Sequence, residues 1–269
     1  MTENVSAKQM SLHTGGIAAT INEIGAFDIP SATESYVPVG HTQFIEIVKE
    51  QAEEKLHDYN FLDEHYGFAP KSGENMGAKM FGVLSFEHHS SPEIALSIGI
   101  RNSYDQSLAA AACVGGKVFV CDNLMFSGDI RVSRKHTGDV INDLESMISN
   151  ALEIAPMRHR DLTRDAEIMK DFDLNLDEAY SIMGMAWGHG VLKPRQLLAA
   201  KQHWHKPPQK EFEDRNLWSL YNAFTEALKT SSHRDILESH TKAHGLVMKQ
   251  GIDLLNNEDQ ELLIQPNLI

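Results

Sequence analysis

Bulky apolar residues alternate with small ones in the central part of the chain. The bulky positions are Ile94, Leu96, Ile98 and Ile100, with Ala, Ser and Gly between them. This period of two predicts a strand with one bulky and one small-residue face. Neighbouring apolar runs predict further strands over 80–88, 118–121 and 130–134. Because the connections are too short for crossover helices, we expect a mainly antiparallel sheet over about residues 60–135.

Apolar residues recur at helical spacing before and after this region. One helix is expected over 41–56, and beyond Gly138 every periodic segment is helical. The later helices are expected over about 139–152, 177–187, a segment that Pro194 opens, 217–228 and 236–255. Strands first and helices second predict an α+β fold, with a sheet and a flanking helix followed by a helical C-terminal half.

Composition and period divide the chain into three parts. Residues 1–35 are rich in Thr, Ser, Gly and Ala, and we expect an extended or flexible N-terminal arm. An α+β sheet domain is predicted over 36–155, and a helical region packed on it over 156–269.

Length and composition exclude several classes of protein. The 269 residues are 42% hydrophobic and include two cysteines, which suits a buried core and excludes a disulfide scaffold. No run approaches the ~18 apolar residues of a transmembrane helix. The N-terminus lacks the pattern of a secretory leader. We therefore expect a cytoplasmic protein that does not bind a membrane.

Four motifs are specific enough to indicate a family. They are Arg-Asn-Ser-Tyr-Asp-Gln-Ser at 101–107, the run at 118–124, Lys-His-Thr-Gly-Asp-Val at 135–140, and Leu-Trp-Ser-Leu-Tyr-Asn-Ala at 217–223. Together they resemble the phage- and plasmid-like family called domain of unknown function 932, over about residues 95–230. The resemblance implies a protein of a mobile genetic element, located in the host cytoplasm if it is phage-encoded. It implies no particular activity.

The chain departs from the family pattern at three positions. Tyr104 stands where His is usual, Gln106 where Gly is usual, and Leu124 follows Asn123 without the usual Gly. Glycine adopts positive φ without steric cost. We therefore expect any turn that needs positive φ at these places to be built differently in this chain.

The net charge of −14 excludes a protein that coats DNA with a uniformly basic surface, but not a local basic site. Residues 193–210 hold five cations, no Asp or Glu, and Trp204. Cations pair with phosphates while an indole stacks on a base, so this segment suits single-stranded nucleic acid. The alternative is a solvated basic helix that Trp204 anchors to the body. The five cations are Lys193, Arg195, Lys201, Lys206 and Lys210.

Two smaller groups of candidate nucleic-acid residues lie at predicted strand ends. One is a basic cluster on a strand edge, made of Arg131, Arg134 and Lys135. The other follows the central strand and consists of Arg101, Asn102, Ser103 and Asp105. A loop held by a sheet suits donation to phosphate or contact with a base edge. The alternative is a simple turn, because Asn, Ser and Asp hydrogen-bond their own backbone.

No motif with known chemistry is complete. Cys121 needs a nearby cation such as His136 to act as a nucleophile, and a buried structural cysteine is the commoner case. His240 and His244 share a helix face, as metal ligands must, but the Glu of a zinc-protease motif is missing. We predict no catalytic residue, metal or cofactor. An enzyme built on Asp105, Cys121, Asp122 and His136 is a lesser alternative.

Methionine and aromatic residues on the later helices are expected to fill the core. Met183, Met185 and Trp187 lie on one predicted helix, and Trp218 and Tyr221 on another. Packing is the commoner role of such residues.

These observations favour a nucleic-acid-binding accessory protein, for example a single-strand binding or annealing factor in phage or plasmid recombination. The alternative is a non-catalytic anti-defence protein whose acidic surface occupies a host defence protein. That alternative places the contact on Asp253, Glu258, Asp259 and Glu261. The expected partners are single-stranded DNA or a host defence protein, and a homo-oligomer is left open.

Overall fold

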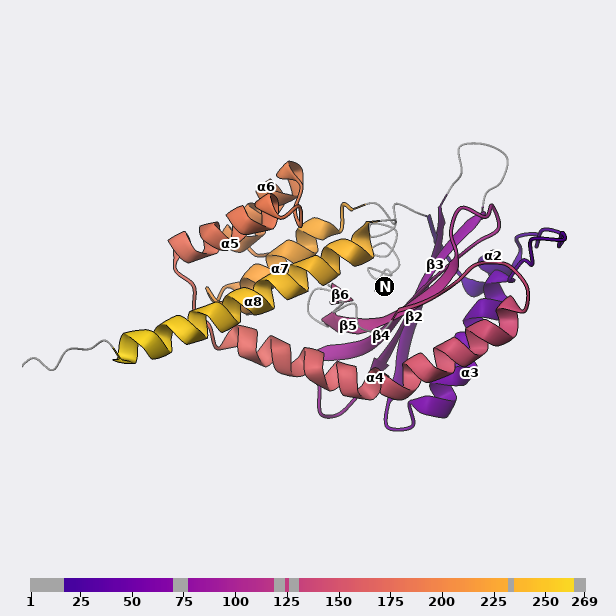
Figure 1. Ribbon diagram of the computed structural model, residues 1–269, viewed down its shortest axis with the longest axis horizontal. Coiled ribbons are helices and arrows are strands. Elements are labelled where there is room, and N and C mark those ends of the chain that lie inside the picture. Colours follow the sequence, from indigo (N-terminus) through magenta and orange to yellow (C-terminus); the bar gives the residue numbers. More distant parts are fainter. Residues whose placement is uncertain (1–16, 70–76, 119–123, 126–130, 232–234, 264–269) are drawn as a thin grey trace, which may run out of the picture.

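The computed structural model describes residues 17–69, 77–118, 124–125, 131–231 and 235–263. It joins an antiparallel sheet, covered by helices, to a helical unit in the C-terminal half (Figure 1). The predicted α+β fold is confirmed. Among the described residues, no helix combines the length and the apolar character needed to cross a lipid bilayer.

Strands that follow one another in the sequence are neighbours in the sheet. The order is β1-β2-β3-β4-β5, and both β6 and β7 pair with β5. All of these pairs are antiparallel, as short connections require. The strands are β1 (Ile17–Ala19), β2 (Asn60–Ala69), β3 (Lys79–Glu87), β4 (Ile94–Ser103), β5 (Ala110–Val118), β6 (Leu124–Met125) and β7 (Arg131–Arg134).

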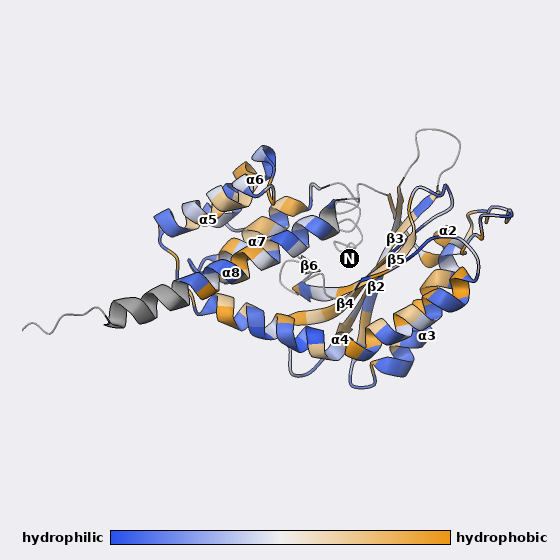
Figure 2. Ribbon diagram, in the orientation of Figure 1, coloured by the Kyte–Doolittle hydropathy of each residue, from blue (hydrophilic) through white to orange (hydrophobic). Residues whose placement is uncertain are grey.

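Two helices cover one face of the sheet, α3 (His41–Lys55) and α4 (Val140–Lys170). The bulky positions of β4 point to this face, where Leu96, Ile98 and Ile100 are buried in one core with residues of both helices. Figure 2 shows that hydrophobic and hydrophilic stripes alternate along α4. The alternation seen in the sequence therefore identifies both the strand and its buried face.

The sequence pattern misses most of β5. Its residues read Ala-Ala-Ala-Cys-Val-Gly-Gly-Lys-Val, and Ala and Gly have a low propensity for strands. The strand nevertheless pairs with β4 from Ile94↔Val118 to Arg101↔Ala111. Burial between β4 and α4 decides the structure here, and intrinsic propensity does not. Of the strand predicted over 118–121, only Val118 lies within the described residues.

The helical unit is built around α7 (Leu217–Leu228). The sequence suggests an amphipathic helix, but its polar residues Ser219, Asn222 and Thr225 are buried as well. Asn222 Nδ2 donates to the carbonyl of Trp218 over 3.0 Å, which satisfies one of these groups locally. The other elements of the unit are α5 (Leu176–Gly188), α6 (Pro194–His205), the 3-10 turn η1 (Lys210–Phe212) and α8 (Ile236–Leu263).

Helix α4 connects the two cores. Its first part, up to Ala155, packs in the sheet core, and Leu162, Ala166 and Met169 pack in the helical core. Pro156 lies between the two parts, and Figure 1 shows the helix bent along its length. A proline removes one helical hydrogen bond and bends the axis. The helix predicted over about 139–152 is therefore too short. The buried positions Leu162, Ala166 and Met169 continue the helical spacing beyond the proline.

Part of the segment expected to be an extended or flexible arm, residues 1–35, forms a strand and a short helix. Strand β1 pairs with β2, and residues Ile21–Gly25 form the short helix α2, which buries Ile24 in the sheet core. Thr20 and Glu23 cap this helix reciprocally. Elements of three and five residues are too short to show a period, so the polar composition hides them. The division at 155–156 stays a prediction, and α4 runs through it.

Candidate nucleic-acid interface

The basic segment predicted over 193–210 forms α6 and the turn after it. Lys193 Nζ lies 3.5 Å from Asp235 Oδ2. The other four cations are exposed, and no carboxylate in the described part of the chain pairs with them. Helices α5 and α6 follow each other as a helical hairpin. Residues 179–210, which run from the second turn of α5 to the end of the basic segment, contain no Asp or Glu. These unpaired positive charges therefore lie on an otherwise acidic chain.

Trp204 is not available for stacking on a base, which corrects the sequence-based assignment. Its side chain is 1% exposed and belongs to the helical core. With Gln196 and Ala200 it forms the buried face of α6, at successive i, i+4 positions. The guanidinium of Arg215 lies 5.0 Å from the centre of its ring. The alternative reading, in which Trp204 anchors the basic helix to the body, is the one that the burial supports.

Two exposed aromatic rings lie on α5 instead. Tyr180 is 39% exposed and Trp187 is 57% exposed. They are seven residues apart, so they lie on the same side of the helix, two turns from each other. The core prediction for Trp187 is therefore wrong, although Met183 is buried as expected. Residues 179, 182, 183 and 186 form the buried face of α5, and position 187 lies at the edge of that face, where its ring reaches solvent.

Tyr180 is held between two residues of α6. Its hydroxyl lies 2.8 Å from His205 Nε2, and Lys201 Nζ lies 5.2 Å from the centre of its ring. Leu198, one turn before Lys201, is 64% exposed. A shallow hollow of about 580 Å³ beside them is lined by Leu198, Lys201, Gln202, His203, His205 and Lys206. We call Tyr180, Trp187, Arg195, Leu198, Lys201, Lys206 and Lys210 the α5–α6 surface.

The side chains of Asn102, Ser103 and Asp105 hold the end of β4 and the turn after it, and they do not form a binding loop. Asn102 and Ser103 are buried. Ser103 Oγ donates to the carbonyl of Leu108 over 2.9 Å. Asp105 Oδ1 accepts from the backbone N–H of Ser107 over 3.1 Å, and its other oxygen lies 3.8 Å from Lys79 Nζ. These side chains satisfy the protein's own polar groups, so the assignment of Asn102, Ser103 and Asp105 to nucleic acid is corrected to the turn alternative.

The family motif at 101–107 attaches the start of α3 to the sheet. Asn102 Nδ2 donates to the carbonyl of Val39 over 2.7 Å and contacts His41 Nδ1 at 3.0 Å. His41 Nδ1 is then the acceptor, and Nε2–H donates to the carbonyl of Gly77 over 2.9 Å. The His41 ring stacks on Tyr104 with centroids 3.7 Å apart. Burial lowers the pKa of His41 to about 4, against the opposing effect of the Gly77 carbonyl.

Gln106 itself adopts a left-handed conformation, at a position where Gly is usual in the family pattern. Its φ is 59°. The expectation that such a turn would be built differently is therefore wrong. The hydrogen bonds that Asp105 makes to Ser107 close the turn around it. An L-residue with a side chain is strained in this region of φ.

The basic cluster on β7 divides into paired and unpaired members. Arg134 Nε donates to Asp143 Oδ2 over 2.8 Å, and its guanidinium also contacts Thr137. Arg134 is therefore a structural residue. Arg131 and Lys135 are exposed. Arg101 of β4 is half-buried, and the pKa of its guanidinium is lowered by burial and by the like charge of Arg131. Of the four cations at the strand ends, Arg101 and Arg131 are thus the two that the fold brings together.

The catalytic and metal alternatives gain little from the geometry. Cys121, Asp122 and Asn123 lie outside the described residues. The described cysteine, Cys113, has a pKa raised by burial to about 11, so its thiol stays protonated. His244 Nε2 lies 3.0 Å from Asp165 Oδ2, an ion-pair geometry within the helical core. Across the described ranges, no three His, Cys, Asp or Glu side chains come close enough to hold a metal ion.

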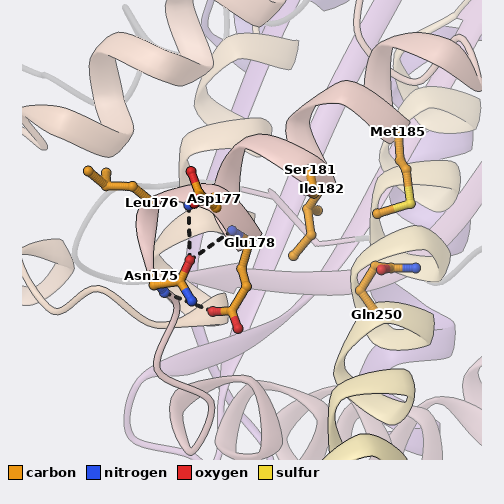
Figure 3. Close-up of a pocket in the computed structure, with 8 residues that line it drawn as sticks. All are labelled: Asn175, Leu176, Asp177, Glu178, Ser181, Ile182, Met185 and Gln250. Carbon is orange, nitrogen blue, oxygen red and sulfur yellow. Dashed lines mark hydrogen bonds between the residues drawn. The ribbon is translucent and has the colours of Figure 1, made fainter.

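A larger pocket of about 650 Å³ lies between the start of α5 and α8 (Figure 3). Its polar groups already serve the helix end. Asn175 Oδ1 accepts from the backbone N–H groups of Asp177 and Glu178, at 2.9 and 3.0 Å. Glu178 Oε2 accepts in turn from the backbone N–H of Asn175 at 2.8 Å. The pocket is therefore a capped helix end beside Gln250, with the side chains of Asn175 and Glu178 engaged in the cap.

Comparison with known proteins identifies the family and no activity. The family model described as Domain of unknown function (DUF932) matches residues 36–254. The match covers most of the chain, so this protein belongs to that family, as the motifs indicate. No curated protein and no solved structure matches the chain.

Proposed function

We propose that this protein binds single-stranded nucleic acid through the α5–α6 surface. One observation supports the proposal above all: exposed rings and cations without described carboxylate partners lie within residues 179–210, a segment free of acidic residues in a chain of net charge −14. Cations that track phosphates and rings that stack on bases are the two parts of a single-strand binding surface.

The geometry suits a few stacked or splayed bases. Tyr180 and Trp187 are about 10 Å apart along the helix axis, from a rise of ~1.5 Å per residue. That distance corresponds to about three nucleotides at ~3.4 Å per nucleotide along a strand. Lys201 lies beside Tyr180, so a phosphate next to a base stacked there would meet a cation. A duplex keeps its bases stacked internally, which leaves it only the phosphate contacts.

The acidic remainder of the chain fits a role in handling single strands. Its charge repels nucleic acid away from the hairpin, so binding is confined to the local basic surface. An accessory factor for annealing or recombination needs strands to bind and to be released, and such a role suits the phage or plasmid setting that the family resemblance implies. The anti-defence alternative relies on the acidic surface and predicts a host protein as the partner instead.

An electrophoretic shift assay tests the proposal directly. A labelled single-stranded oligonucleotide should shift at micromolar protein in low salt, and the shift should weaken steeply as salt rises because counterions are released on binding. A duplex of the same sequence serves as the control and should bind more weakly. The absence of any shift in low salt would exclude the proposal.

A further inference from the structure

A pair of cations, Arg101 and Arg131, lies on the sheet face opposite α3 and α4. Successive side chains of a strand point to opposite faces. Ile100 of β4 and Val132 of β7 are buried in the core beneath the helices, so their neighbours Arg101 and Arg131 point to the other face. Both arginines therefore lie on the same side of the sheet, where Arg131 is exposed and Arg101 is half-buried.

Small side chains separate the two arginines. Strand β5 lies between β4 and β7, with Arg101 paired to Ala111 and Arg131 paired to Cys113. The two Cα atoms are two strands and two residues apart, which amounts to about 12 Å from the usual strand spacings. Long guanidinium side chains can converge over this distance, and the β5 side chains between them, Ala111 and Cys113, are small.

Within the described residues, neither arginine has a partner for its charge. No described residue forms an ion pair or hydrogen bond with the guanidinium of Arg101 or Arg131, and Arg101 Nε is buried without a hydrogen bond. The two like charges lie close enough to influence each other. Cys113 between them is a protonated thiol and supplies no negative charge. A half-buried guanidinium beside a like charge is unfavourable unless an anion binds it.

The carboxylates on the same side are engaged elsewhere. Asp63 accepts from Lys117 Nζ over 2.8 Å. Asp105 lies 3.8 Å from Lys79 Nζ and also accepts from Ser107. Among the described residues, these two acids are therefore engaged by lysines and by a turn.

We propose that Arg101 and Arg131 together bind one phosphate group. The planar guanidinium presents two parallel N–H donors that match two oxygens of a phosphate, and two guanidiniums surround it. Exposed Ser133 lies two residues beyond Arg131 on the same face and adds a hydroxyl donor. The phosphate is either a phosphodiester of a bound strand, which rests on the proposed function, or a free phosphate, which does not.

Two titrations of the full chain test this site. Pyrophosphate is titrated calorimetrically in chloride buffer, and a single-stranded oligonucleotide is titrated by fluorescence anisotropy. The variant is Arg101→Gln with Arg131→Gln, and the matched control is Arg134→Gln, whose guanidinium already pairs with Asp143. We expect the double variant to lose roughly 10- to 100-fold in affinity for at least one of the two probes, as for lost charged hydrogen bonds. The control should bind like the wild type.

Each outcome separates the site from the proposed function. Loss of pyrophosphate binding with no DNA binding in any variant supports a free-phosphate site even though the proposed function fails. Loss of DNA affinity alone supports a phosphodiester site. Unchanged affinity for both probes, or no binding of either by the wild type, overturns the proposal. Removing unpaired charges should leave the melting temperature equal or higher, and Arg131→Gln alone, at an exposed side chain, serves if the double variant does not fold.

Discussion

Gln106 shows how neighbouring contacts can hold a residue with a side chain in a left-handed conformation. The turn that follows β4 needs a positive φ, and Gln106 supplies it at 59°. Asn102, Ser103 and Asp105 hold the backbone around it through the hydrogen bonds described above. The surrounding contacts therefore outweigh a local strain of about 1–2 kcal/mol.

Replacing this residue by glycine should stabilise the protein. We expect Gln106→Gly to raise the free energy of unfolding by about 0.5–1 kcal/mol, because relief of the strain exceeds the extra freedom that glycine gives to the unfolded chain. Urea denaturation gives the value. Gln106→Ala keeps the strain and should bring no such gain; equal effects of the two variants would contradict the account.

His41 should make folding sensitive to acid. Its pKa is about 4 in the folded protein and 6.5 when exposed, so below pH 6.5 the unfolded chain takes up a proton that the folded chain does not. Stability from this group is therefore full above pH 6.5 and is lost as the pH falls toward 4, by at most about 3 kcal/mol. The hydrogen bond from Asn102 to Nδ1 is the contact that protonation breaks.

Denaturation at pH 7.5 and at pH 4.5 measures the effect. The stability of His41→Gln should change less between these two pH values than that of the wild type. The pKa values of His136 and His159 are lowered by burial as well, so part of the acid sensitivity should remain. If the variant and the wild type lose the same stability, His41 is not responsible.

At the scale of elements, the sequence predicts those whose hydrophobic pattern is strong. The strand at 94–100, the helix at 41–56 and the helix opened by Pro194 all form as expected. Most of strand β5 is not predicted, because its Ala and Gly residues show no hydrophobic alternation. Helix α2 is not predicted because five residues are too few to show a helical period. The candidate site is predicted only as a segment. Which aromatic ring faces solvent depends on the packing of α5 and α6. Trp204, predicted to stack on a base, is buried, and Trp187, predicted to fill the core, is exposed.

Aromatic substitutions on α5 and α6 should separate binding from stability. Trp204→Ala removes a large buried side chain and should cost about 3–5 kcal/mol of stability. Tyr180→Ala and Trp187→Ala should hardly change stability, but each should reduce the affinity for single strands, by ~1–3 kcal/mol per stacked base. Phe61→Ala, at an exposed ring on β2, is the matched control. Anisotropy and thermal melts give both quantities, and equal affinity for all exposed-ring variants would contradict the assignment.

At the scale of the whole molecule, charge is distributed unevenly. The chain carries 38 acidic and 24 basic residues, yet residues 179–210 are free of acids. The basic α5–α6 surface lies on the helical unit, and the arginine pair lies on the sheet. The account thus assigns the binding of nucleic acid to local positive surfaces on a body that repels it elsewhere.

The salt dependence of binding tests this central claim most directly. The slope of log affinity against log salt is measured for the wild type and for the triple variant with Ser at Lys201, Lys206 and Lys210, on a single-stranded oligonucleotide. We predict weaker binding to every sequence and a slope flatter by up to ~2, because each lost phosphate contact removes about 0.7. Stability should stay within about 0.5 kcal/mol of the wild type, since these lysines are exposed. Unchanged affinity and an unchanged slope in the folded variant would contradict the account.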